Sequence, residues 1–121
     1  MKTSSCKQKG RRCCQETKDL MHKHSPVLEQ GDIYVTSSGE TGEDLKLSPA
    51  ARKVYPIVVE CKNVEKLNVF AAMEQCEGHK LDTQWEPALF FKKNRTKLYA
   101  CIDAEYLIRL LTIANKQTEN K

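Results

Sequence analysis

The sequence contains no apolar run approaching the ~20 residues that a membrane-spanning helix requires, although 40% of its 121 residues are hydrophobic. The N-terminal stretch from Met1 to Cys6 is polar and lacks the apolar core of a secretory signal peptide. We therefore expect no membrane contact and a cytoplasmic location. The length is that of one domain with a single modest core.

The six cysteines include no Cys-x2-Cys pair, the spacing typical of many structural zinc sites. A zinc site could recruit Cys13, Cys14, His22 and His24, but their spacing fits no standard zinc finger. A disulfide framework is typical of secreted chains, and the polar N-terminus does not indicate that this chain is secreted. We instead expect free cysteines that pack as small hydrophobic side chains at apolar positions of helices and strands. The cysteines at such positions are Cys13, Cys14, Cys61 and Cys101.

The charge balance is mildly basic, with 20 Lys and Arg against 16 Asp and Glu and a formal net charge of +4. Such a balance permits nucleic-acid binding without requiring it. We expect a flexible polar tail over residues 1–9, a single domain over residues 10–115 and a second polar tail over residues 116–121.

Hydrophobic periodicity and capping residues predict an alternation of helices and strands. Helices are expected over residues 10–24, 64–78 and 103–114, with Gly78 ending the second, and one helical turn over residues 49–53 after the cap residue Ser48. Strands are expected over residues 31–36, 44–47, 56–63, 87–91 and 98–102. The last helix should bury an apolar stripe of Tyr106, Leu107, Leu110, Leu111 and Ala114.

The strand over residues 56–63 ends in an acid and an amine two residues apart. Glu60 and Lys62 should project from one face of this strand, while Val59 and Cys61 pack on the other. Sixteen residues before Glu60, a glycine-rich loop leads to a second acid, Asp44. Asp followed by Glu-x-Lys is typical of metal-dependent nucleases, because Mg²⁺ takes carboxylate ligands and an ammonium can orient the attacking water. The competing interpretation is an ion pair on a solvated edge strand, but the apolar run before Glu60 indicates a strand buried on both sides, where charge is costly.

Five short blocks, in order, carry a resemblance to a known family. They are Ser37-Ser38-Gly39, Gly42-Glu43-Asp44, Leu47 to Lys53, Glu60-Cys61-Lys62-Asn63 and Glu74-Gln75. Over roughly residues 9 to 112 the chain resembles the PD-(D/E)xK nuclease superfamily, in particular phage-type endonucleases related to Holliday-junction resolvases. The resemblance implies an α/β fold with a restriction-endonuclease-like core, in which helices flank a mixed central sheet. Glu43-Asp44 replaces the Pro-Asp of the family, so either acid could be the principal metal ligand, and we favour Asp44.

The resemblance also implies roles for individual residues. Asp44 and Glu60 would hold Mg²⁺, for which Mn²⁺ could substitute, and the backbone carbonyl of Cys61 would be a further ligand. Lys62 would lie beside the attacking water, and Gln75 would face the site from its helix. In the resembled resolvases an acid of the first helix approaches the metal, and Glu16 is the only glutamate available, although its spacing differs and a solvated position is the alternative.

Several polar and basic residues are candidates for contacts with phosphate. Ser38 lies in the glycine- and serine-rich loop, and a basic turn between the last two strands brings several cations together. The alternative for each is an ordinary solvated surface residue. The basic candidates are Arg52, Lys53, Lys92, Lys93 and Arg95.

Together these features predict a Mg²⁺-dependent DNA endonuclease of phage origin, acting in a bacterium or a phage-infected cell. It would be structure-selective or similar to a Holliday-junction resolvase. Two sites facing matching strands of duplex or branched DNA would suit a homodimer. The alternative is a non-catalytic nucleic-acid-binding module on a nuclease fold. The sequence contains no separate base-reading domain, so it does not choose among junctions, duplexes, nicked or single-stranded DNA, and RNA.

Overall fold

The computed structural model describes residues 2–36, 43–80 and 84–119. Its centre is a sheet of five strands in the order β1-β2-β3-β4-β5, in which β3 and β4 are parallel and the other neighbours are antiparallel. The strands are β1 (Ile33–Val35), β2 (Leu45–Leu47), β3 (Ile57–Asn63), β4 (Glu86–Lys92) and β5 (Tyr99–Ile102). The predicted mixed sheet is thus confirmed.

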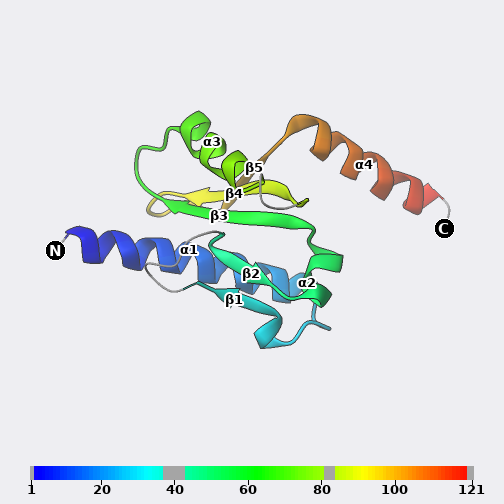
Figure 1. Cartoon of the computed structure of the whole chain (residues 1–121), viewed down its shortest axis with the longest axis horizontal. Coiled ribbons are helices and arrows are strands. Elements are labelled where there is room, and N and C mark those ends of the chain that lie inside the picture. Colours follow the sequence, from blue (N-terminus) through cyan, green and yellow to red (C-terminus); the bar gives the residue numbers. More distant parts are fainter. Residues whose placement is uncertain (1, 37–42, 81–83, 120–121) are drawn as a thin grey trace.

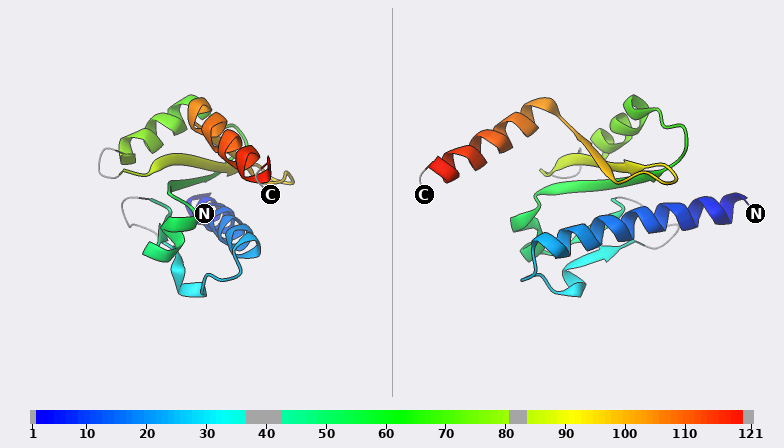
Figure 2. Two further views of the ribbon diagram at one scale, coloured as in Figure 1. Left: turned by 90° about the vertical axis from the view of Figure 1, so that its right-hand side faces the viewer. Right: turned by 180° about the vertical axis from the view of Figure 1, so that it is seen from behind.

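Two helices lie on opposite faces of this sheet (Figure 1, Figure 2). Helix α1 (Lys2–His24) covers one face and α3 (Val69–Lys80), which connects β3 to the parallel strand β4, covers the other. The short helix α2 (Pro49–Val54) links β2 to β3, and a 3₁₀ turn over Gln30–Asp32 precedes β1. The last helix, α4 (Ala104–Glu119), follows β5.

The central strand β3 lies between two separate cores, one on each face of the sheet. Val59 and Cys61 belong to the cluster that packs against α1, together with Cys13 and Cys14. On the other face, Leu89 of β4 packs with residues of α3, including Cys76. Because β3 alternates between these cores, its even-numbered residues Glu60 and Lys62 face the α3 side, as the sequence predicts.

Several helix boundaries differ from the sequence-based expectation, among them the end of α4, which continues to Glu119 into the predicted polar tail. Helix α1 begins at Lys2, so residues 2–9 are helical where we expected a flexible tail. Helix α3 begins at Val69, after Asn68 caps it by accepting a hydrogen bond from the backbone N of Ala71 at 3.0 Å. It then runs through Gly78 to Lys80, since glycine weakens a helix by only about 1 kcal/mol and need not end it.

Helix α4 does not bury the apolar stripe predicted for it. Leu107, Leu110 and Leu111 are 44%, 42% and 60% exposed, and Ile108 and Ile113 are more than half exposed. The helix runs away from the sheet toward the C-terminus rather than back across it (Figure 1, Figure 2), so neither core reaches most of its length. Among the described helices, none combines the length and apolar character that a membrane crossing requires.

Helix α2 depends on the predicted cap residue Ser48. Its hydroxyl oxygen accepts a hydrogen bond from the backbone N of Ala51 at 3.1 Å and donates one to Asp32 at 2.7 Å. We expect Ser48→Ala to lower the free energy of unfolding by about 1 kcal/mol, measured by urea denaturation. Ser48→Thr keeps the hydroxyl and should retain most of the stability. Equal stability of Ser48→Ala and the parent would contradict this role.

Candidate active site

The backbone of Asp44 is held where β2 and β3 diverge. Its backbone N donates to the carbonyl of Val59 at 2.9 Å, next to the Leu45–Val59 pair of the two strands. The next amide on that edge of β3, the backbone N of Cys61, donates to Oδ2 of Asp44 at 2.7 Å instead of to a strand. The carbonyl of Asp44 also accepts hydrogen bonds from the backbone N and the hydroxyl of Thr36. The carboxylate is therefore fixed beside the middle of β3.

Glu60 lies next to this carboxylate, in the interior of the protein. Its side chain is on the α3 face of β3 and is only 3% exposed. Lys62 follows two residues later on the same face and is half-buried. The structure thus brings Asp44, Glu60 and Lys62 together, as the sequence-based hypothesis requires.

The environment of Glu60 raises its pKa to about 8. Burial is the largest cause, followed by the negative charge of Asp44, while Lys62 acts in the opposite direction. A hydrogen bond between the two carboxyl groups also favours the protonated form of Glu60. Without a cation, this raised pKa keeps Glu60 largely protonated near neutral pH.

These two carboxyl groups fit a hard divalent cation. Ionised carboxylates repel each other in a buried site, and a bound cation removes that repulsion while taking the oxygen ligands that Mg²⁺ prefers. Asp44 and Glu60 would hold the ion, and the carbonyl of Cys61, between Glu60 and Lys62 in the chain, stays a predicted further ligand.

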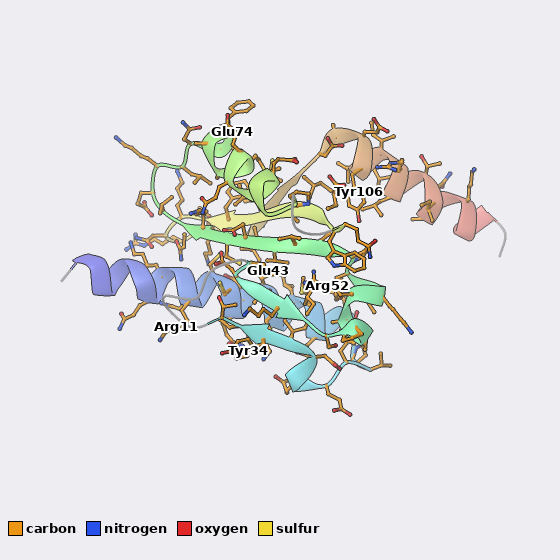
Figure 3. All side chains as sticks on the ribbon, viewed as in Figure 1. Arg11, Tyr34, Glu43, Arg52, Glu74 and Tyr106 are labelled. Carbon is orange, nitrogen blue, oxygen red and sulfur yellow. The ribbon has the colours of Figure 1, made fainter. Side chains whose placement is uncertain are left out.

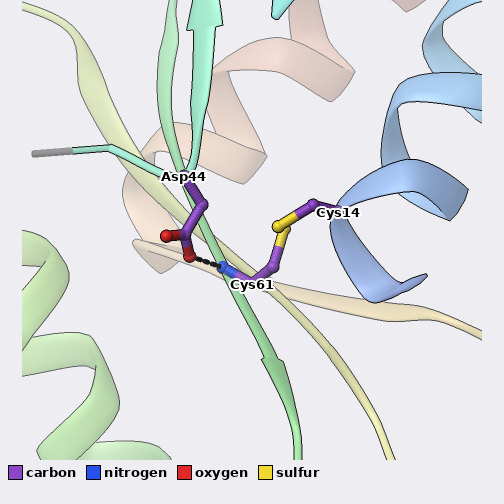
Figure 4. A group of neighbouring side chains, drawn as sticks. All are labelled: Cys14, Asp44 and Cys61. Atoms are coloured by element: carbon purple, nitrogen blue, oxygen red, sulfur yellow. Dashed lines mark hydrogen bonds between the residues drawn. The ribbon is translucent and has the colours of Figure 1, made fainter. Parts of the chain in front are cut away.

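A second group of potential ligands shares Asp44 with this pair and adds two thiols from the α1 side of β3 (Figure 4). The ligand atoms of Cys14, Asp44 and Cys61 all lie within 4.8 Å of one another. Thiolates are soft ligands that suit zinc rather than magnesium, so this group does not support the Mg²⁺ prediction. Neighbouring thiols and burial raise the pKa of Cys61, which favours its neutral thiol form. The sequence did not indicate this group, because Cys14 and Cys61 meet only through the packing of α1 on β3.

The other cysteine predictions can be compared with the structure directly. Cys13, Cys14, Cys61, Cys76 and Cys101 are free, as expected. The zinc set of Cys13, Cys14, His22 and His24, which their spacing did not favour, does not appear as a group, since within the described residues the three-residue ligand group contains neither histidine.

Glu43 forms an ion pair with Arg52 and does not belong to the pair of Asp44 and Glu60 (Figure 3). Nη2 of Arg52 lies 2.7 and 2.8 Å from the two carboxylate oxygens of Glu43, and both side chains are largely covered. The same guanidinium donates to the carbonyl of Ile57 and lies 5.6 Å from the ring centroid of Trp85. This geometry favours Asp44 over Glu43 as the metal ligand. It also removes Arg52 from the candidate phosphate contacts, because its donors serve the protein interior.

The basic turn is likewise only partly available for phosphate. Nζ of Lys92 pairs with Oε2 of Glu16 at 3.0 Å, which ties β4 to α1 and gives Glu16 a structural partner. Lys93 and Arg95 are exposed, and Arg95 has a φ of 68°, the left-handed conformation of a tight turn. These two residues keep the predicted role in phosphate binding.

The remaining predicted residues fall in different places. Lys53 is exposed on α2, and Ser38 lies outside the described residues. Gln75 is exposed on α3, whereas its neighbour Cys76 is fully buried. Burial is the largest cause that raises the pKa of Cys76 to about 12, and the acids Glu60 and Asp44 act in the same direction. Cys76 is thus close enough to the carboxyl pair for their electrostatic interaction to matter, and the role of Gln75 stays a prediction.

No model of a protein family matches this chain. Neither a curated protein nor a solved structure matches it. The interpretation of the site therefore rests on its own geometry.

The raised pKa of Glu60 predicts a pH-dependent stability in EDTA. Because the pKa of about 8 in the folded state lies above the unfolded value near 4.5, the folded state holds the extra proton between these limits. The contribution of Glu60 is fully present below about pH 4.5 and is lost as the pH rises through about 8, with a slope approaching about 1.4 kcal/mol per pH unit. Glu60→Gln cannot lose this proton, so it should gain stability relative to the parent across that range.

The measurement is urea unfolding of the parent and Glu60→Gln at several pH values. A stability difference between them that stays constant from pH 5 to pH 8 would contradict the assigned environment.

Proposed function

We propose that this protein is a Mg²⁺-dependent DNA endonuclease. The observation that carries the proposal is the buried pair of Asp44 and Glu60 carboxyl groups with Lys62 on the same strand face. A carboxylate pair of this kind costs stability in a protein that does not use it, and it suits a divalent ion.

Each residue of the site has a defined part in the reaction. When bound, Mg²⁺ supplies Lewis-acid charge at the phosphate and lowers the pKa of its own water. Asp44 is fixed by the Cys61 amide, and Glu60 accepts the ion by giving up its proton. Lys62 contributes a positive charge that orients the attacking water and stabilises the charge that develops on the phosphoryl oxygens.

The fold is consistent with the finer proposal of a restriction-endonuclease-like core. An initial helix, three strands, a crossover helix and a parallel strand occur in this order, with α1 and α3 on opposite faces. The family resemblance in the sequence supports the same assignment. The exposed cations Lys53, Lys93 and Arg95 are the proposed phosphate contacts, and DNA backbone contacts of this type are independent of base sequence.

The first test uses Asp44→Asn and Glu60→Gln, made singly. Both keep the size of the side chain and remove the charge that a divalent ion requires. We expect cleavage in Mg²⁺ to fall by at least about 100-fold for each, a loss of roughly 3 kcal/mol in transition-state stabilisation, while the protein stays folded. The measurement is gel-resolved cleavage of a four-way junction, a linear duplex and a single strand, in Mg²⁺, Mn²⁺ and EDTA.

The matched control is Glu74→Gln, an exposed acid on α3, which should cleave like the parent. The competing hypothesis, a non-catalytic binding module, predicts no metal-dependent cleavage by the parent. Intact DNA in all three substrates with both metals would overturn the nuclease assignment.

We also propose that α4 pairs with α4 of a second copy. In an antiparallel arrangement centred between Leu110 and Leu111, Leu110 of one copy faces Leu111 of its partner. Ile108 then faces Ile113. The apolar positions of this helix are therefore self-complementary. This is the isologous pattern of a two-fold dimer, and it gives the exposed apolar residues a partner.

The test of this pairing is the double substitution Ile108→Glu and Leu111→Glu. Both side chains are about 60% exposed, so the fold should survive while four buried charges prevent pairing. We expect the parent to sediment as a dimer at micromolar concentration and the variant as a monomer. Val27→Glu, at an 85% exposed position elsewhere, should stay dimeric, and a monomeric parent would contradict the pairing.

A further inference from the structure

A small apolar pocket lies between the turn that joins β4 to β5 and the segment before α3. Its volume is about 240 Å³, below the roughly 300–1,000 Å³ of pockets that enclose drug-sized ligands. Leu67 and Val69 form one wall, and Phe91 and Tyr99 form another. Such a pocket suits a single flat ring system.

The two aromatic residues face the pocket from neighbouring strands. Phe91 and Tyr99 are paired across β4 and β5, with ring centroids 6.3 Å apart and ring planes inclined by 31°. Tyr99 is 52% exposed, which leaves part of its ring open to a ligand. The pocket therefore offers an aromatic surface for stacking.

The edge of the pocket is cationic. Lys93, which is exposed, lines it, and Nζ of Lys97 lies 5.3 Å from the ring centroid of Tyr99. Oε2 of Glu65 accepts a hydrogen bond from the backbone N of Asn94 at 2.7 Å, which holds the turn against the opposite wall. An apolar, aromatic interior with positive charge at its edge matches a nucleotide, whose base stacks while its phosphate meets the cations.

The pocket is next to the candidate active site on the same side of the sheet. Phe91 is the direct neighbour of Lys62 in the parallel pairing of β3 and β4, and adjacent strands lie about 4.8 Å apart. Both side chains face α3, since Phe91 packs against the cluster that includes Ala72 and Cys76. A base in the pocket would thus belong to a nucleotide close to the phosphate at Lys62.

From these observations we infer that the pocket binds one unpaired nucleobase of the DNA substrate, beside the phosphate that is cleaved. This inference rests on the proposed nuclease function and narrows its substrate. A base inside a continuous duplex is stacked and paired, so entering the pocket costs its unstacking, and a base in a single-stranded segment avoids that cost. DNA that carries unpaired nucleotides is then preferred over fully paired duplex.

The test measures binding without cleavage, by fluorescence anisotropy in EDTA. The probes are a labelled single-stranded oligonucleotide and a blunt duplex of the same sequence. Loss of stacking on one base should weaken binding of the single strand to Tyr99→Ala by roughly 5- to 150-fold, with little change for the duplex. Tyr99→Phe keeps the ring and should bind like the parent.

The matched control is Tyr34→Ala, because Tyr34 is a similarly exposed tyrosine, at 47%, on the opposite edge strand β1. Its affinity for both probes should equal that of the parent. Unchanged single-strand affinity of Tyr99→Ala, an equal loss for both probes, or no binding of the single strand by the parent would each overturn the inference.

The two proposals can fail separately. Metal-dependent cleavage by the parent, with single-strand binding that is indifferent to Tyr99, would leave the nuclease standing and remove the base pocket. Tyr99-dependent binding without cleavage of any DNA would leave the pocket and remove the nuclease.

Discussion

The hydrogen bond from the backbone N of Cys61 to the carboxylate of Asp44, at 2.7 Å, is the contact on which the site depends. A strand amide in the middle of a sheet ordinarily donates to a neighbouring strand. Here β2 and β3 diverge after Val59, and a side chain takes the place of the missing strand. The divergence of the strands leaves room for Asp44 beside Glu60. The hydrogen bond to Asp44 gives the backbone N–H of Cys61 an acceptor that it would otherwise lack.

The same arrangement explains why Glu60 holds its proton. Two carboxyl groups that lie close together in the interior cannot both be charged without a large cost, so the metal-free protein keeps one of them neutral. Arg52 neutralises the third acid nearby, Glu43, and keeps it out of the pair. With one proton the carboxyl pair carries a single negative charge, and a divalent ion in place of the proton neutralises both carboxylates. Repulsion between the two groups is therefore relieved by the proton in the metal-free protein and by the cation when the ion is bound.

The sequence predicted the parts of the structure that local signals determine. The alternation of β3 placed Glu60 and Lys62 on one face, and Ser48 before a proline predicted the start of α2. The sequence did not predict contacts between distant segments, such as Arg52 with Trp85, Lys92 with Glu16, or Cys14 with Cys61. A charged residue looks solvated until the packing that supplies its partner is known. The prediction that α4 buries its apolar stripe was wrong for a related reason. An amphipathic pattern indicates that a helix has an apolar face, but it does not indicate which surface, in the same chain or another, will cover that face.

A divalent ion that binds to Asp44 and Glu60 should displace the proton that Glu60 holds in the metal-free protein. Calorimetric titration with Mn²⁺ at pH 7, in two buffers with different ionisation enthalpies, counts the protons released on binding. With the pKa of Glu60 at about 8, the parent should release close to one proton per ion, and Glu60→Gln should release almost none from this site. Binding of Mn²⁺ by the parent without proton release, or no binding at all, would contradict the claim.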